Sequence, residues 1–126
     1  MSYAINNAKR KENFMIVTAW SNGTPLKSGA GYGLKLDAGD QERIFQREWK
    51  TIILELEGAP DEFEVNIAKP SFWGATFREL INAEISRWLI RNGLAPWSKG
   101  VPPKLLLKQI KDNRFFLMKS NVRNKS

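Results

Sequence analysis

Residues 51–67, TIILELEGAPDEFEVNI, indicate the fold class more firmly than any other stretch of this 126-residue chain. The first half alternates, with Ile52, Leu54 and Leu56 on one side, and a period of two with one apolar side is typical of a half-buried strand. A Gly-Ala-Pro-Asp turn follows, and the alternation resumes at Phe63. The stretch therefore predicts an antiparallel β-hairpin with one face on the core.

Short apolar runs bounded by turn residues predict four more strands: Phe14–Trp20, Tyr32–Leu36, Leu105–Ile110 and Arg114–Lys119. A tight turn at 111–113 joins the last two. The glycines at alternate positions in Gly29–Gly33 precede a strand rather than a helix. A β-bulge or a close crossing of strands therefore explains them better than a phosphate-binding loop does.

Two segments predict helices. Asp37–Glu48 combines good helix formers with a small apolar cluster and predicts one short helix. Phe77–Asn92 predicts the main helix, because its apolar residues recur at steps of three and four. Thr76 and Glu79 fit a capping box at its start, and Gly93 is placed for a left-handed C-cap.

Six strands, one main amphipathic helix and one short helix predict an α+β fold, either a mostly antiparallel curled sheet or a partly open small barrel. The length fits one domain, expected over residues 14–120, after a flexible arm of 1–13 and before a polar basic tail of 121–126. No stretch is apolar enough for a membrane helix, and the start lacks the apolar core of a signal peptide. These features predict a cytoplasmic protein that does not contact a membrane.

The chain contains neither cysteine nor histidine. Disulfide scaffolds, the usual zinc sites, thiol nucleophiles and histidine-based catalytic triads are therefore excluded. Any chemistry would have to use carboxylates, Lys, Arg, Tyr, Ser or Thr. We expect no cofactor and no resident metal, and the composition favours a protein that is not an enzyme.

Charge is distributed unevenly between the two halves of the chain. Residues 1–68 carry 8 Lys or Arg and 10 Asp or Glu, whereas residues 69–126 carry 12 Lys or Arg and 3 Asp or Glu. A basic half with interleaved aromatic residues suits a polyanion, above all nucleic acid. The predicted nucleic-acid-binding residues are Arg87, Arg91, Trp97, Lys99 and Lys104, extended by Lys108 and Arg114.

The aromatic residues of this half have alternative roles. Trp88 lies on the apolar face of the predicted helix and is expected in the core. Trp97 and Trp73 either stack on a base or pack against the core, and packing is the more common fate of tryptophan. In a further alternative the Trp97 loop docks on a protein partner, and the basic charge serves solubility. Oligomeric state is left open.

An acidic pair has spacing seen in one class of metal-dependent nucleases. Asp37 follows a predicted strand, and Glu48-Trp49-Lys50 enters the next strand. A carboxylate pair with a lysine can hold a metal ion and activate water. The alternative is that Asp37 or Asp40 caps a helix while the other charges lie on the surface, and chance matches are common in so charged a chain. A ribosome-associated toxin nuclease would also fit the size of the chain and its lack of histidine, but the sequence contains no matching motif.

The predicted hairpin carries five acids on its polar face: Glu55, Glu57, Asp61, Glu62 and Glu64. They serve as a solvated face, or as a negative patch that meets a basic partner or the basic half of a second copy of the chain. In the basic half, the stretches at 71–73, 87–89, 92–103 and 113–115 (SFW, RWL, NGLAPWSKGVPP, NRF) resemble a small bacterial domain family without an established role. That resemblance brings no catalytic residues with it.

Overall fold

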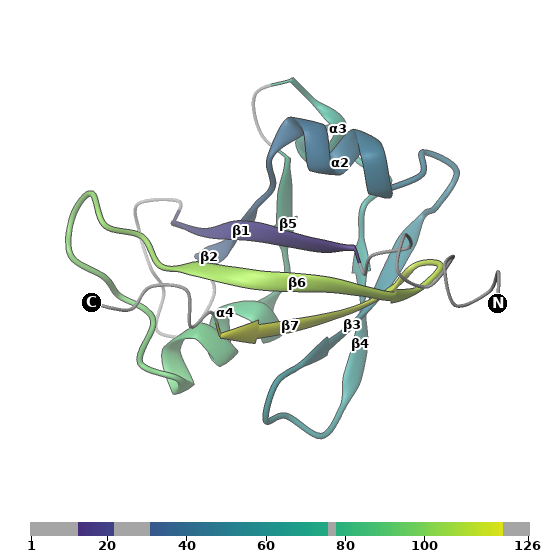
Figure 1. Cartoon of the computed structure of the whole chain (residues 1–126). Helices are drawn as coiled ribbons and strands as arrows, with labels where there is room; N and C mark the ends of the chain where they lie inside the picture. Colours follow the sequence, from purple (N-terminus) through teal and green to yellow (C-terminus); the bar gives the residue numbers. More distant parts are fainter. Residues whose placement is uncertain (1–12, 22–30, 76–77, 120–126) are drawn as a thin grey trace, which may run out of the picture.

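The computed structural model describes residues 13–21, 31–75 and 78–119 (Figure 1). It is a small α+β fold in which the seven strands of one mixed sheet form a nearly closed barrel, with three helices in the described part. The elements in chain order are β1 (Phe14–Ser21), β2 (Tyr32–Lys35), α2 (Ala38–Ile44), β3 (Thr51–Leu56), β4 (Glu62–Asn66), α3 (Pro70–Trp73), β5 (Glu79–Ile81), α4 (Ala83–Arg91), β6 (Lys104–Lys111) and β7 (Arg114–Lys119).

The sheet has the strand order β4-β3-β7-β6-β1-β2-β5. All neighbours are antiparallel except β3 and β7, which run parallel, with Leu54 opposite Phe115. The edge strands approach one another, and the Asn82 side chain donates a hydrogen bond of 3.4 Å to the Glu64 carbonyl across the gap. The predicted hairpin at 51–67 is confirmed as β3 and β4.

The core fills the inside of the barrel, and helices cover its two ends. In Figure 1, α2 and α3 lie at one end and α4 at the other. Phe45 stacks on Phe115 with ring centroids 4.8 Å apart beneath α2. Trp88 of α4 is 1% exposed, so its predicted place in the core is confirmed. No described helix is long and apolar enough to cross a membrane.

The predicted helix Phe77–Asn92 is wrong before Asn82, so Glu79 does not stand in the first turn of a helix as the predicted capping box requires; Thr76 and Phe77 lie outside the described residues. Glu79–Ile81 is the strand β5, which pairs with the otherwise free edge of β2. Arg78 has a φ of 117°, which no helix contains, and its carbonyl accepts a hydrogen bond from the Leu36 amide. The helix begins after Asn82, whose side chain accepts from the Glu84 amide at 2.7 Å. The apolar pattern of residues 79–81 fits a helix or a strand, and pairing with β2 makes this segment a strand.

The ends of the other helices also differ in part from the predicted ones. The predicted helix Asp37–Glu48 ends early, because the chain becomes extended at Phe45 and places that ring in the core. The short helix α3 was not predicted, although it has Pro70 at its first position. Gly93 has a φ of 71° after α4, which confirms the left-handed C-cap. Of the predicted arm and tail only Asn13 lies within the described residues, and its side chain donates to that of Gln109.

Gly33 marks a close approach of two strands, as the sequence predicts. A Cβ atom at this position would lie 2.7 Å from the Leu80 carbonyl oxygen of β5. Gly33→Ala is therefore expected to push β5 away from β2 and to lower the free energy of unfolding by about 1–3 kcal/mol. Urea denaturation followed by circular dichroism measures the change. An unaltered midpoint would contradict the proposed crowding.

Glu79 is an unusual charged residue in the wall of the barrel. It is 4% exposed, and its Oε2 atom has no hydrogen-bond partner in the described part of the chain. Burial raises the pKa of the Glu79 carboxyl, while the positive charges of Lys35 and Lys69 lower it in part. A carboxyl with a raised pKa in the folded state stabilises the fold most at acidic pH, and the contribution is lost as the pH rises through that pKa.

Replacing Glu79 by glutamine removes the free-energy cost of burying a charged carboxylate. Because a neutral amide costs less to bury than a carboxylate, Glu79→Gln is expected to raise the free energy of unfolding at pH 7 by about 1 kcal/mol. The gain should shrink as the pH falls through the raised pKa of Glu79, because the wild-type carboxyl then takes up its proton and is buried without charge. Thermal melting at several pH values tests this. A glutamine variant that is less stable at neutral pH would show that the lysines dominate.

Candidate nucleic-acid interface

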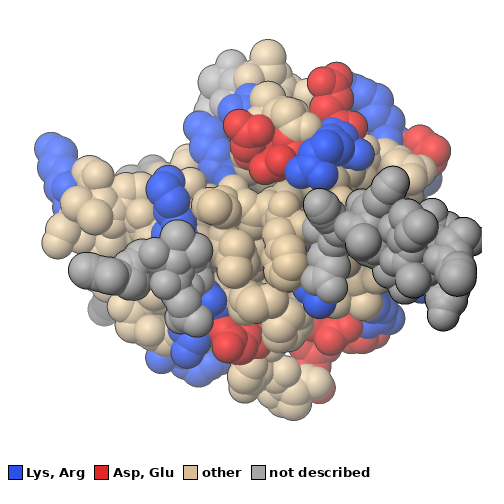
Figure 2. All heavy atoms as spheres, viewed as in Figure 1, with Lys and Arg blue, Asp and Glu red and all other residues tan. Residues whose placement is uncertain are grey.

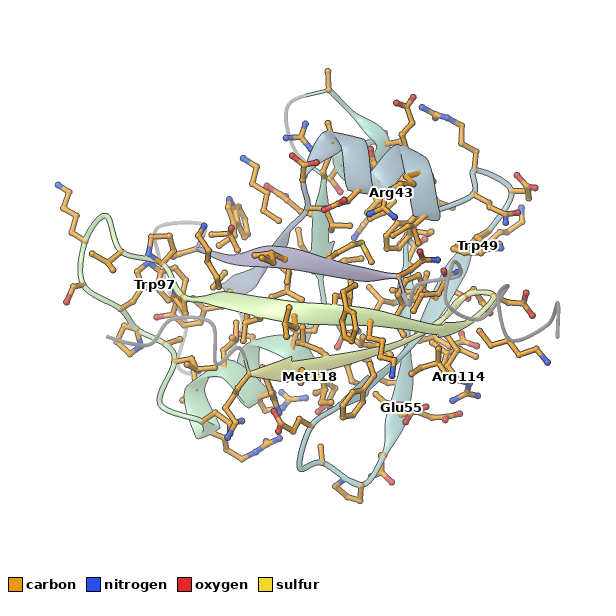
Figure 3. All side chains as sticks on the ribbon, in the orientation of Figure 1. Arg43, Trp49, Glu55, Trp97, Arg114 and Met118 are labelled. Carbon is orange, nitrogen blue, oxygen red and sulfur yellow. The ribbon has the colours of Figure 1, made fainter. Side chains whose placement is uncertain are left out.

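The residues predicted to bind nucleic acid do not converge on one surface. Arg87 and Arg91 lie on α4, Trp97 and Lys99 on the loop before β6, and Arg114 at the start of β7. Trp97 and Arg114 lie on opposite sides of the molecule in Figure 3. Lys104 and Lys108 share one strand, β6, between these two positions.

The arginines of α4 lie beside acidic groups. Arg87 forms an ion pair of 2.6 Å with Glu84 one turn earlier. Arg91 lines a hollow of about 440 Å³ together with Glu84, Asp61 and Glu62. Both arginines are exposed. The local field at this end of the barrel is therefore mixed rather than strongly positive, which makes it a poor match to a chain of phosphates.

Arg114 is held by the acidic hairpin. Its Nη1 atom donates to Glu55 at 2.9 Å and also to Glu62. These bonds lower the pKa of the Glu62 carboxyl and raise that of the Arg114 guanidinium. Glu57 accepts a hydrogen bond of 2.8 Å from the Lys119 amide. The negative patch of the first half thus meets the basic half within the same chain, and a phosphate would have to displace Glu55 and Glu62 to reach Arg114.

The two candidate stacking tryptophans pack against the protein. Trp97 is partly buried against the core, and its ring centroid lies 5.3 Å from that of Tyr32. Trp73 packs edge-on against Phe72, and the Arg47 guanidinium lies 4.6 Å above its ring. The structure therefore shows the packing alternative for both tryptophans, because each ring lies partly buried against other aromatic side chains of the protein.

The structure instead presents an open face on the outside of β1, β6 and β7. Successive residues of a strand point to opposite sides of a sheet, and Met15, Leu105 and Phe115 point into the core. Their strand neighbours point outward and are half-buried or exposed. We define the outer sheet face as these outward residues: Phe14, Ile16, Thr18, Lys104, Leu106, Lys108, Phe116 and Met118.

Strand register arranges the outer sheet face in three rows. The first row is Phe14, Lys108 and Phe116, directly opposite one another on three neighbouring strands. The second row is aliphatic, with Ile16, Leu106 and Met118. The third row pairs Thr18 with Lys104, whose Nζ donates to the Thr18 hydroxyl at 3.3 Å. Aromatic, aliphatic and basic side chains thus lie within one small area.

Two of the apolar side chains on this face are well exposed. Phe14 is 44% exposed and Ile16 is 49% exposed. No described helix covers the outside of β1, β6 and β7 in Figure 1, and the front of the molecule in Figure 2 has an uncharged centre bordered by both basic and acidic residues. The Lys108 ammonium lies 5.6 Å from the centre of the Phe14 ring. A contiguous apolar area with a charged rim is typical of a binding surface.

One border of the outer sheet face is acidic. Glu55 of β3 lies opposite Phe116 of β7, and both line a hollow of about 460 Å³ together with Asp61 and Glu62. Figure 3 shows Glu55 beside Arg114 at this border. A polyanion on the face would be repelled from the hollow and attracted toward the β6 lysines. The charges therefore favour one side of the face for a phosphate backbone.

The structure places Asp37 as a helix cap. Its carboxylate accepts hydrogen bonds from the amides of Gly39 and Asp40 at 3.0 and 3.2 Å, which is the alternative weighed against a nuclease site. Glu48 and Lys50 lie exposed between α2 and β3. Among the described residues, no group of three or more acidic side chains is placed to hold a metal ion.

The outer sheet face is not among the surfaces predicted from the sequence, although the sequence contains one pattern that indicates it. β1, β6 and β7 contain the runs FMIV, LLL and FFLM, which are apolar on both sides of the strand. A strand with one wet face normally alternates. Because no described helix or strand covers these continuous apolar runs, they indicate an outward face that contacts something else.

No protein-family model matches this chain, and no match was found among curated proteins or among solved structures. The resemblance to a small bacterial domain family therefore stays a prediction, and function has to be argued from the geometry alone.

Proposed function

We propose that the protein is a non-enzymatic nucleic-acid-binding domain that uses the outer sheet face. The observation that carries the proposal is the row Phe14, Lys108 and Phe116, in which a cation on β6 lies between aromatic rings on the two strands beside it, β1 and β7. Flat rings stack on bases, and lysines bind phosphates, so one row offers both kinds of contact. A net charge of +7 adds long-range attraction for a polyanion.

This proposal keeps two of the residues predicted from sequence and replaces the others. Lys104 and Lys108 lie on the outer sheet face, four residues apart on β6. The predicted residues outside it, Arg87, Arg91, Trp97, Lys99 and Arg114, would contribute through the general field rather than through direct contact. The aromatic role passes from Trp97 to Phe14 and Phe116.

The test is a fluorescence anisotropy titration of labelled oligonucleotides, single-stranded and duplex, at 50 and 200 mM salt. Binding should weaken linearly in a plot of log affinity against log salt, because lysine–phosphate contacts release counterions. Absence of binding at low salt, or binding that does not depend on salt, contradicts the proposal.

A protein partner is the second candidate, and the aliphatic row favours it. Ile16, Leu106 and Met118 present apolar surface without hydrogen-bonding groups, which suits a protein surface better than a nucleic acid. In that case Ile16→Asp abolishes partner capture, whereas lysine substitutions on β6 have little effect. If the lysine substitutions weaken binding more than Ile16→Asp does, nucleic acid is the supported partner.

A further inference from the structure

We infer that the nucleic acid is bound as a single strand, with separate bases on Phe14 and Phe116 and its phosphates along the lysines of β6. The inference rests on the proposed function and adds the form of the ligand. It follows from three features of the outer sheet face: the spacing of its rings, the position of its lysines and its acidic border.

The spacing of the two rings excludes stacked neighbouring bases. Phe14 and Phe116 are separated by the intervening strand β6, hence by two strand spacings or about 9.5 Å at the backbone. Bases along one strand of a duplex rise by only about 3.4 Å each. Two bases can lie on the two rings only when they are spread apart, and a paired duplex does not allow this.

The lysines give the backbone a path beside the rings. Lys104 and Lys108 point outward from the same strand, and four residues of extended chain span about 13 Å. Lys108 lies in the row between the rings, and Lys104 lies on the side away from the acidic hollow at Glu55 and Glu62. Phosphates along β6 therefore meet positive charge and stay clear of the acidic border.

The face also matches the chemistry of exposed bases. In a duplex each base already stacks on its neighbours, so the Phe14 ring finds no free base face except at the ends. An unpaired strand offers its base faces, and stacking of this kind tolerates any base. The aliphatic row beside the rings adds apolar contact for the sugars. Binding with weak sequence preference is the expected consequence.

The experiment compares a single-stranded 12-mer with the duplex of the same sequence, at one salt concentration, for the wild type and three variants. Phe14→Ala removes a stacking ring, and Ile90→Ala is the matched control, because Ile90 is similarly exposed (42% against 44%) but lies on α4, outside the outer sheet face. We expect the single strand to bind at least about 10-fold more tightly, and Phe14→Ala to weaken its binding roughly 5- to 150-fold. Ile90→Ala should change it less than about 3-fold, and Phe14→Tyr, which keeps the ring, should bind like the wild type.

Each outcome separates the inference from the proposed function. Equal or tighter binding of the duplex overturns the single-strand inference but leaves a nucleic-acid-binding domain. Equal losses for Phe14→Ala and Ile90→Ala overturn stacking on Phe14. If neither the single strand nor the duplex binds, the proposed function is overturned as well. Circular dichroism of each variant establishes that the fold is retained.

Discussion

Reversal of both lysines on β6 should weaken binding of single-stranded nucleic acid about 100-fold. Lys104→Glu and Lys108→Glu each remove a charged hydrogen bond to phosphate, worth about 1.5 kcal/mol or more, which is roughly tenfold in affinity. The salt dependence should also become shallower by about 1.4 in log–log slope, because two phosphate contacts are lost. Anisotropy titrations at several salt concentrations give both numbers.

The matched control reverses two exposed lysines away from the outer sheet face. Lys50 lies between α2 and β3, and Lys99 lies on the Trp97 loop. The variant Lys50→Glu/Lys99→Glu has the same net charge as the β6 double variant. It should lose less than about 3-fold in affinity, because only the general field changes. Equal losses for the two double variants would show that net charge, and not this face, accounts for binding.

The largest effect on stability is expected at Trp88. Its ring is 1% exposed between α4 and the barrel, and its Nε1 atom donates to the Glu57 carbonyl at 2.8 Å. Trp88→Ala leaves a large cavity and removes this bond, so it should cost about 3–5 kcal/mol. That is a large part of the total stability of a domain of this size, and urea unfolding followed by far-UV circular dichroism measures it.

Trp88→Phe is the informative companion variant. It keeps most of the apolar contact but leaves the Glu57 carbonyl without its donor, so the expected cost is about 1–3 kcal/mol. A loss below about 1 kcal/mol for Trp88→Ala would contradict the tight packing of α4 on the barrel.

Local signals in the sequence predict six of the seven strands of the sheet and miss β5. Strands with a regular alternation or a clear turn, such as the hairpin at 51–67 and the pair β6–β7, were found because the pattern is local. β5 was assigned to a helix, because Leu80 and Ile81 fit both periods and only the free edge of β2 decides between them. The N-cap at Asn82 was the local signal for the true helix start.

The functional surface was predictable only in part, for a physical reason. Charge counts identified a basic half of the chain, but charge along a sequence does not show which cations are already paired. Arg87 and Arg114 are bonded to carboxylates that lie 3 and 52–59 residues away in sequence. A face built from three strands depends on which strands are neighbours, and the pairing of β1 with β6 joins residues about 90 positions apart.

The central claim is that the outside of β1, β6 and β7 binds a single strand of nucleic acid. The most direct measurement is a titration of ¹⁵N-labelled protein with a short oligothymidine, followed by amide chemical shifts. We expect the largest shifts in Phe14–Thr18, Lys104–Lys108 and Phe116–Met118. Shifts confined to α4 and the loop around Trp97, with these three strands unchanged, would contradict the account.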